Sequence, residues 1–159
     1  TSVVIPDSVT TIGDRAFAGC TSLESFTVKQ DGEDTPGIVH AAAEEGLQSI
    51  GSYAFEGCAN LTKIELPKTV ETIGEGTFSG CASLKEITIP GSVKQIAAEA
   101  FKNCPELISV SFEGSAPVFE EGVFEGSGNV VIYYDPEQAN PADFPFDVKV
   151  TEKKDESRP

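Results

Sequence analysis

Four cysteines and one histidine are the residues of this chain whose side chains offer nucleophilic or metal-binding chemistry. Cys20, Cys58, Cys81 and Cys104 each stand three residues after a phenylalanine, in the motif Phe-x-x-Cys-x-x-Leu. His40 is remote from all four motifs and lies in an acidic segment. A Cys–His nucleophilic pair needs the two side chains in contact, so the sequence gives little support to an enzyme of this type.

The surroundings of the cysteines favour buried, reduced thiols. Each one lies between two apolar residues of its motif, where a free cysteine acts as a small apolar side chain. A disulfide ladder stays open as an alternative, because equivalent residues of neighbouring strands lie about 5 Å apart and a bridge spans that distance. Their side chains would run parallel, however, which is poor bridging geometry. Zinc is disfavoured, since the chain has no Cys-x-x-Cys pair and a straight ladder cannot surround a tetrahedral ion.

The acidic and glycine-rich segments contain no recognisable catalytic or ligand-binding motif. Asp31-Gly-Glu-Asp34 lacks the alternating ligand spacing of a calcium loop. The segment GEGTFSG, 74–80, lacks the lysine of a phosphate-binding loop. We therefore predict no catalytic residues, no metal site and no cofactor.

The charge and the hydropathy pattern exclude further classes. The net charge is −15, from 26 acidic and 11 basic side chains. Nucleic-acid binding depends on Lys and Arg contacts with phosphates, so this balance argues against it. No apolar run approaches the roughly 20 residues of a membrane-spanning helix, and we expect no membrane insertion.

The motif recurs because the chain is built from repeats. Phe55, Phe78, Phe101 and Phe124 are spaced by 23 residues, and Phe17 precedes Phe55 by 38. A fixed period in the twenties is typical of a solenoid. Residues one period apart should then lie above one another. The predicted core ladder comprises Phe17, Phe55, Phe78, Phe101, Phe124, Cys20, Cys58, Cys81 and Cys104.

One unit, LTKIELPKTVETIGEGTFSGCAS at 61–83, shows how a coil is organised. Ile64-Glu65-Leu66 alternates between apolar and polar residues, as a strand does, and Pro67 ends that strand. Val70 and Ile73 predict a second short extended stretch. The segment around Phe78 predicts about one helical turn. The fold class is therefore an α/β repeat solenoid of about five to six coils, with a parallel sheet and short helical turns.

The same register divides the chain. We predict a solenoid over 1–136, with a last strand in 129–136, and a C-terminal cap and polar tail over 137–159. The long first interval implies an insertion at about 30–46, in which one or two helical turns could form. The first coil has no cover, so we expect further repeats or a cap before Thr1, or pairing of this edge with another molecule.

The repeats resemble the BspA-like leucine-rich repeats. The resemblance rests on IPDSVTTIGDRAFAGCTSL at 5–23 and LKEITIPGSVKQIAAEAFKNC at 84–104. It implies a curved parallel β solenoid. It also implies a surface or secreted protein, largely bacterial, that takes part in adhesion or protein binding. We therefore expect an extracellular or cell-surface location.

The outward positions of the main sheet are the first candidate for partner binding, because solenoids commonly bind on such a surface. In the last strand we assign these positions to Ile132 and Tyr134. The insertion is the second candidate. We expect a protein or glycan partner for a non-enzymatic adhesion module, with a structural spacer that has no ligand as the alternative. The candidate partner face comprises Lys29, Lys63, Glu65, Glu86, Thr88, Ser109, Ser111 and Tyr134.

Overall fold

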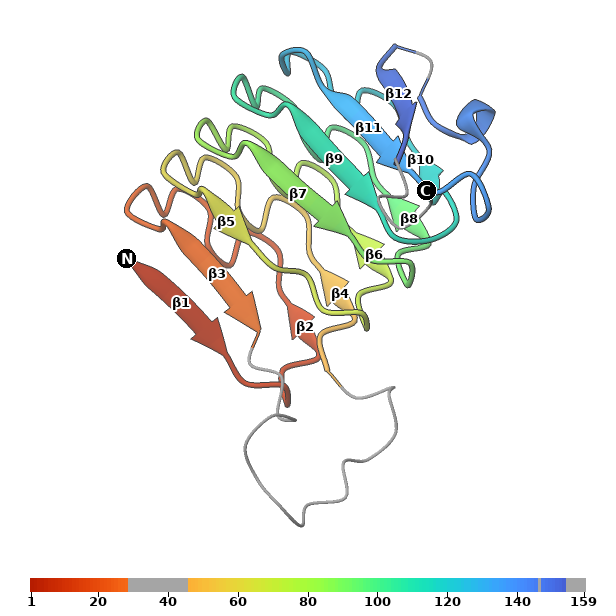
Figure 1. Cartoon of the computed structure of the whole chain (residues 1–159). Coiled ribbons are helices and arrows are strands. Elements are labelled where there is room, and N and C mark those ends of the chain that lie inside the picture. Colours follow the sequence, from red (N-terminus) through yellow and green to blue (C-terminus); the bar gives the residue numbers. More distant parts are fainter. Residues whose placement is uncertain (29–45, 146, 154–159) are drawn as a thin grey trace.

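The computed structural model describes residues 1–28, 46–145 and 147–153, and in them the chain winds into a solenoid (Figure 1). Each of the first five coils contributes one strand to a front row and one two-residue strand to a back sheet. All the strand pairs are parallel. The front strands are β1 (Ser2–Ile5), β3 (Ser25–Val28), β5 (Lys63–Ile64), β7 (Glu86–Ile89), β9 (Ser109–Phe112), β11 (Val131–Tyr134) and β12 (Lys149–Glu152). The back strands are β2 (Thr11–Ile12), β4 (Ser49–Ile50), β6 (Thr72–Ile73), β8 (Gln95–Ile96) and β10 (Val118–Phe119).

The strands form where the sequence alternates, and the 23-residue period sets their register. Ile87 and Ile89 of β7 are buried, whereas Glu86 and Thr88 are exposed. In the back sheet Ile73 pairs with Ile96, one period later. Parallel stacking thus places like residues over like, and the predicted solenoid is confirmed.

The segments that follow the back strands, where the sequence predicts about one helical turn, are hydrogen-bonded turns rather than regular α-helix. The N–H of Cys81 donates to the Phe78 carbonyl three residues earlier, at 3.2 Å. The N–H groups of Phe55 and Phe78 instead donate to Thr77 and Ala100 of the following coil, both at 2.8 Å. Because these amides bond between coils, the hydrogen bonds of an α-helix cannot form. The only helix in the described part of the chain is the 3₁₀ helix η1 (Pro141–Asp143).

A single column of phenylalanine rings runs through the core. Successive rings of Phe17, Phe55, Phe78, Phe101 and Phe124 stack with centroids 5.2–5.6 Å apart and planes within 10–16° of parallel. Offset stacking at such distances is favourable beyond the burial of area. The column is therefore the predicted core ladder, and it holds each coil against its neighbours.

The C-terminal segment closes the front half of the solenoid end. β12 pairs with β11 and extends the front row by one strand. The buried ring of Phe144 packs against Phe112 and Tyr134, with centroids 5.1 and 5.4 Å away. The helical turns expected within the insertion fall outside the described residues. Among the described residues, none belongs to a helix with the length and apolar character that crossing a bilayer requires.

Candidate binding groove on the front sheet

The front row is interrupted between its third and fourth strands. β1, β3 and β5 form one sheet, and β7, β9, β11 and β12 form another. Elsewhere the strands are joined by backbone bonds, such as Ile108 N–H to the Lys85 carbonyl at 2.9 Å and Thr62 N–H to the Glu24 carbonyl at 2.9 Å. By the same pattern Lys85 N–H should donate to the Thr62 carbonyl, but within the described chain no such bond forms. β5 and β7 are neighbours without a ladder between them (Figure 1).

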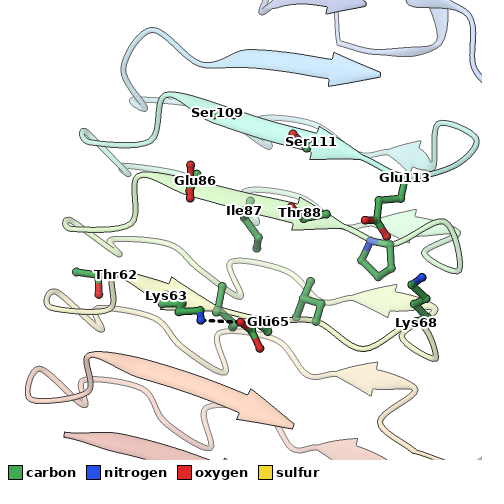
Figure 2. Close-up of a pocket in the computed structure, with 13 residues that line it drawn as sticks. Thr62, Lys63, Glu65, Lys68, Glu86, Ile87, Thr88, Ser109, Ser111 and Glu113 are labelled. Atoms are coloured by element: carbon green, nitrogen blue, oxygen red, sulfur yellow. Dashed lines mark ion pairs between the residues drawn. The ribbon is translucent and has the colours of Figure 1, made fainter. Parts of the chain in front are cut away.

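A groove of about 660 Å³ lies over this interruption (Figure 2). Its walls come from three consecutive strands and from the segments that follow them. The inward-facing Ile64 and Ile87 also reach the groove, because no ladder closes the sheet between them. The predicted face residues that line it are Lys63, Glu65, Glu86, Thr88, Ser109 and Ser111.

The groove surface combines polar and apolar side chains and carries both signs of charge. Lys63 Nζ and Glu65 Oε1 are 2.7 Å apart, and both side chains are more than half exposed, at 64% and 60%. An exposed ion pair of this kind stabilises a fold by about 0–1 kcal/mol. Either partner can therefore exchange it for a contact with a ligand at little cost. Serine and threonine hydroxyls supply both donors and acceptors along the rest of the groove.

The structure places six of the eight predicted face residues together in this groove. Lys29 lies outside the described residues. Tyr134 does not belong to the face. Lys68 and Glu113 at the rim were not predicted, because they follow the strands rather than occupying outward strand positions.

The assignment of Ile132 and Tyr134 to the outward face is wrong. Both are buried, Tyr134 with 3% of its surface exposed. Ser109 pairs with Val131 and Ser111 with Tyr133, so this interval is 22 residues rather than 23. A shift of one residue turns every side chain of a strand to the opposite face. Tyr133 is consequently the aromatic residue that β11 presents outward.

The buried position of Tyr134 also affects the pKa of its hydroxyl. Its hydroxyl lies 3.4 Å from Glu152 Oε1 of β12. Burial and the nearby Glu152 carboxylate together raise the pKa of Tyr134. Tyr134 is thus a core residue of the C-terminal end and not part of a binding face.

The cysteines are free, and three of them are buried between coils. Each of these thiols donates to the carbonyl of the phenylalanine in the preceding coil: Cys58 to Phe17 at 3.1 Å, Cys81 to Phe55 at 3.3 Å and Cys104 to Phe78 at 3.1 Å. In the fifth repeat Ser127 makes the same contact with Phe101. The thiol is therefore both an apolar filler and a hydrogen-bond donor, and the second role was not predicted.

Cys20 departs from the prediction of a buried ladder. It is exposed, and within the described residues its coil has a neighbouring coil on one side only. The other thiols are held in their neutral form. Burial raises the pKa of Cys58 and of Cys104 to about 11, and that of Cys81 further still.

These environments predict the reactivity of each thiol. At pH 8 a thiol reagent should modify Cys20 of the folded protein rapidly, and Cys58, Cys81 and Cys104 only after unfolding, because thiolate and access are both required. Counting released chromophore with and without denaturant measures this. Replacing Cys20 with serine should abolish the fast phase. Fewer than four reactive thiols in denaturant under non-reducing conditions would show that disulfides form.

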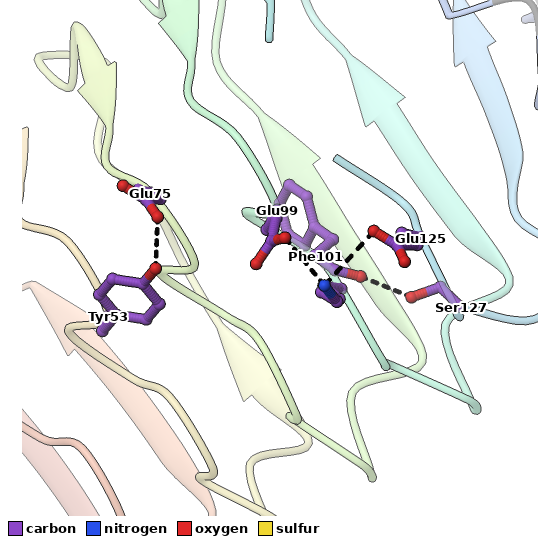
Figure 3. Close-up of polar contacts among 7 residues, drawn as sticks. Tyr53, Glu75, Glu99, Phe101, Glu125 and Ser127 are labelled. Atoms are coloured by element: carbon purple, nitrogen blue, oxygen red, sulfur yellow. Dashed lines mark hydrogen bonds and ion pairs between the residues drawn. The ribbon is translucent and has the colours of Figure 1, made fainter. Parts of the chain in front are cut away.

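A second set of polar contacts joins the coils at the turn edge (Figure 3). Lys102 Nζ lies 2.8 Å from Glu99 Oε1 and 3.3 Å from Glu125 Oε2, so it bridges two coils. The hydroxyl of Tyr53 donates to Glu75, and this bond raises the pKa of Tyr53. Within the described residues these groups pair with one another, and no three His, Cys, Asp or Glu side chains gather in a way that could hold a metal ion.

Comparison with known proteins agrees with this architecture. Residues 1–131 match the family model described as a BspA type leucine rich repeat region, in six copies. None of the curated protein sequences compared with the chain matches it.

Three solved structures resemble the chain over nearly its whole length. A leucine rich cell surface protein from Faecalibacterium prausnitzii is 24% identical over 98% of this chain and 33% of its own, with a TM-score of 0.60. A leucine-rich repeat protein from Bacteroides ovatus is 28% identical over 97% of this chain and 42% of its own, with a TM-score of 0.59. A leucine rich repeat protein from T. pallidum is 26% identical over 94% and 72%, with a TM-score of 0.55. The chain thus spans less than half the length of the first two.

Proposed function

The chain belongs to the BspA-type leucine-rich repeat family, and on this basis we propose that it is a non-enzymatic protein-binding or adhesion module of a cell-surface protein. Its partner, a protein or a glycan, binds in the groove over the interruption of the front row. The observation that carries the proposal is this groove of about 660 Å³, to which β5, β7 and β9 all contribute side chains. The family match and the likeness to a protein described as a leucine rich cell surface protein support a surface location.

The interruption supports binding at this place rather than elsewhere along the front row. Among the described residues, no strand bonds to the backbone carbonyl of Thr62 or to the backbone N–H of Lys85. Both groups form strong hydrogen bonds, and a ligand in the groove can complete them. The exposed side chains of Lys63, Glu65 and Glu86 flank these groups and add charge selectivity.

The alternative function is a structural spacer that presents another domain. The groove's own lining favours this alternative in one respect, since it contains no Trp, Tyr or Arg. These residues dominate the binding energy of most protein interfaces. A partner of this groove should accordingly bind with modest affinity, through polar contacts spread over several coils.

A charge-reversal experiment separates the two functions. The variant with Lys63→Glu and Glu86→Lys should lose at least tenfold in affinity for a ligand found by screening immobilised matrix proteins and glycans with biolayer interferometry. The lost contacts are two charge-assisted hydrogen bonds, each contributing about 1.5–3 kcal/mol.

The matched control is Lys94→Glu, which reverses an exposed charge beside the back sheet. Lys94 Nζ pairs with Glu71 Oε1 at 2.9 Å and has no contact with the groove. The affinity of the Lys94→Glu variant for the ligand should equal that of the wild type. Failure of the wild type to bind any screened ligand, or equal binding by all three proteins, would favour the spacer.

A further inference from the structure

The last coil of the back sheet leaves a row of backbone groups without partners. Val118 and Glu120 donate their N–H groups to the carbonyls of Lys94 and Ile96, at 2.9 and 3.1 Å. One period later, the equivalent carbonyls belong to Pro117 and Phe119. In the part of the chain that the structure describes, nothing donates to either of them.

The turn of the same coil carries the complementary groups. Glu99, Phe101 and Asn103 donate their N–H groups to the carbonyls of the next coil, at 3.2, 2.8 and 2.8 Å. Their counterparts in the last coil find no acceptor among the described residues. These unpaired N–H groups belong to Gly122, Phe124 and Gly126. The coil therefore offers carbonyls along β10 and then amides along its turn, the pattern to which each preceding coil pairs its main chain.

Among the described residues the back sheet ends at β10, whereas the front row continues through β11 to its edge strand β12 (Figure 1). Phe144 covers the boundary, with ring centroids 5.1 Å from Phe112 and 6.0 Å from Phe119. Val118 stands at the outward position of β10, where the preceding back strands carry Thr72 and Gln95, and it is 67% exposed.

A groove of about 670 Å³ follows the open edge, between the last coil and the segment around Phe144. Its lining is largely apolar, from Pro117 to Phe119, Val123 to Phe124, and Pro145. Among the described residues, every charged side chain of the lining is acidic; these are Glu120, Glu121, Asp143 and Asp147. Glu120 already accepts bonds from Gln95 and from the Ala98 N–H, and Asp143 caps η1, but both keep their negative charge.

We propose that this rear groove docks an extended, basic segment of a partner polypeptide, which pairs with β10 as a further coil would. Unpaired carbonyls along β10 and unpaired amides along the turn that follows can both be matched by a peptide main chain, and strand addition at an open edge is an established mode of recognition. The apolar lining accepts alternate aliphatic side chains, and the acidic rim selects Lys or Arg between them. A second copy of this chain is a poor occupant, because each copy carries a net charge of −15.

A peptide of ten residues in which Lys and Val alternate is a direct probe. Titrated into ¹⁵N-labelled protein, it should shift the amide signals of Gly122, Phe124 and Gly126 and slow their hydrogen exchange at least tenfold. A peptide with Glu in place of Lys should not bind. The Lys/Val peptide with N-methyl groups on alternate residues should lose the amide shifts, because it cannot donate to the Pro117 and Phe119 carbonyls.

Charge reversal of the rim tests the selectivity. The double variant Glu121→Lys, Asp147→Lys should bind the Lys/Val peptide with at least tenfold lower affinity. Glu106→Lys reverses an exposed charge outside the groove lining and should leave the affinity unchanged. Equal weakening by both variants would mean attraction to the overall charge alone and would overturn the proposal. The proposal would also be overturned, in favour of a second copy, if the protein without peptide self-associates in sedimentation runs and the three amides are then protected from hydrogen exchange.

The rear groove and the front groove are separate surfaces, so the two proposals fail separately. The variants at Lys63 and Glu86 leave the rear edge intact and should bind the Lys/Val peptide normally. The variants at Glu121 and Asp147 should bind a ligand of the front groove with unchanged affinity.

Discussion

Replacing Phe78 with alanine is expected to lower the free energy of unfolding by about 3–5 kcal/mol, the usual effect of removing a buried phenylalanine. Phe78 is fully buried, and its ring stacks on Phe55 at 5.5 Å and on Phe101 at 5.3 Å. Each coil of a solenoid contacts only its neighbours, so its stability depends on the interfaces between adjacent coils. The substitution weakens two of these interfaces at once, in the middle of the column. Urea unfolding followed by far-ultraviolet circular dichroism measures the loss.

Phe17→Ala is the matched control for this substitution. Phe17 is the first member of the column and stacks on one neighbour only, Phe55, at 5.2 Å. It is also partly exposed. Replacing Phe17 should lower the free energy of unfolding clearly less than replacing Phe78. Unfolding should remain a single cooperative transition. Equal losses for the two variants would contradict a stability that resides in the contacts between coils.

Raising the pH from about 9 to 11 is expected to destabilise the protein through its buried thiols. The pKa of Cys104 rises from 9.0 to about 11, chiefly because burial penalises the thiolate. Below pH 9 the thiol is neutral in the folded and the unfolded states, and it has no effect on the pH dependence. Above pH 9 it ionises first in the unfolded chain, so stability falls until the pH passes the folded pKa. A difference of about two pKa units corresponds to about 2–3 kcal/mol.

Cys104→Ser isolates this contribution. Ser127 shows that a hydroxyl fits the equivalent position of the next coil, where it bonds to the Phe101 carbonyl. The variant should therefore fold, and its stability should fall less steeply than that of the wild type between pH 9 and 11. Tyrosines such as Tyr53 and Tyr134 titrate in both proteins, so their contribution cancels in the difference. Parallel stability curves over this range would show that folding does not raise the pKa of Cys104.

The two grooves differ in what they can bind. The front groove combines polar and apolar side chains, with charges of both signs in its lining, and its unpaired backbone groups lie at the break between β5 and β7. The rear groove is largely apolar with an acidic rim, and its unpaired groups follow β10 and the turn after it. The two proposals therefore assign ligands of different chemistry to two separate surfaces.

Much of the fold was predictable, because a repeat applies one local pattern many times. Side chains one period apart must superpose, so Phe55, Phe78 and Phe101 were expected in one column, and the stacked rings confirm it. The alternation of Glu86 to Ile89 likewise indicated which side chains of β7 face outward. Six residues of the front groove followed from this alternation alone.

The break in the front row was not predictable. LTKIELP at 61–67 and LKEITIP at 84–90 have the same pattern of apolar and polar residues. Nevertheless β7 pairs with β9, whereas β5 does not pair with β7. Whether two adjacent strands form a ladder depends on the distance and angle between their backbones, and the apolar pattern of a single repeat does not specify these.

The period, the parallel stacking, most of the inward residues and the family could be predicted from the sequence, since all of these are properties of one repeated unit. The exposure of Cys20, the reversed faces of Ile132 and Tyr134, the turns between coils and the open rear edge became visible only in the folded chain. Each of these depends on what lies against a coil rather than within it. Within the described residues the coil of Cys20 and the back strand β10 have a neighbour on one side only, a shortened interval turns a strand over, and an amide bonded to the next coil cannot build a helix.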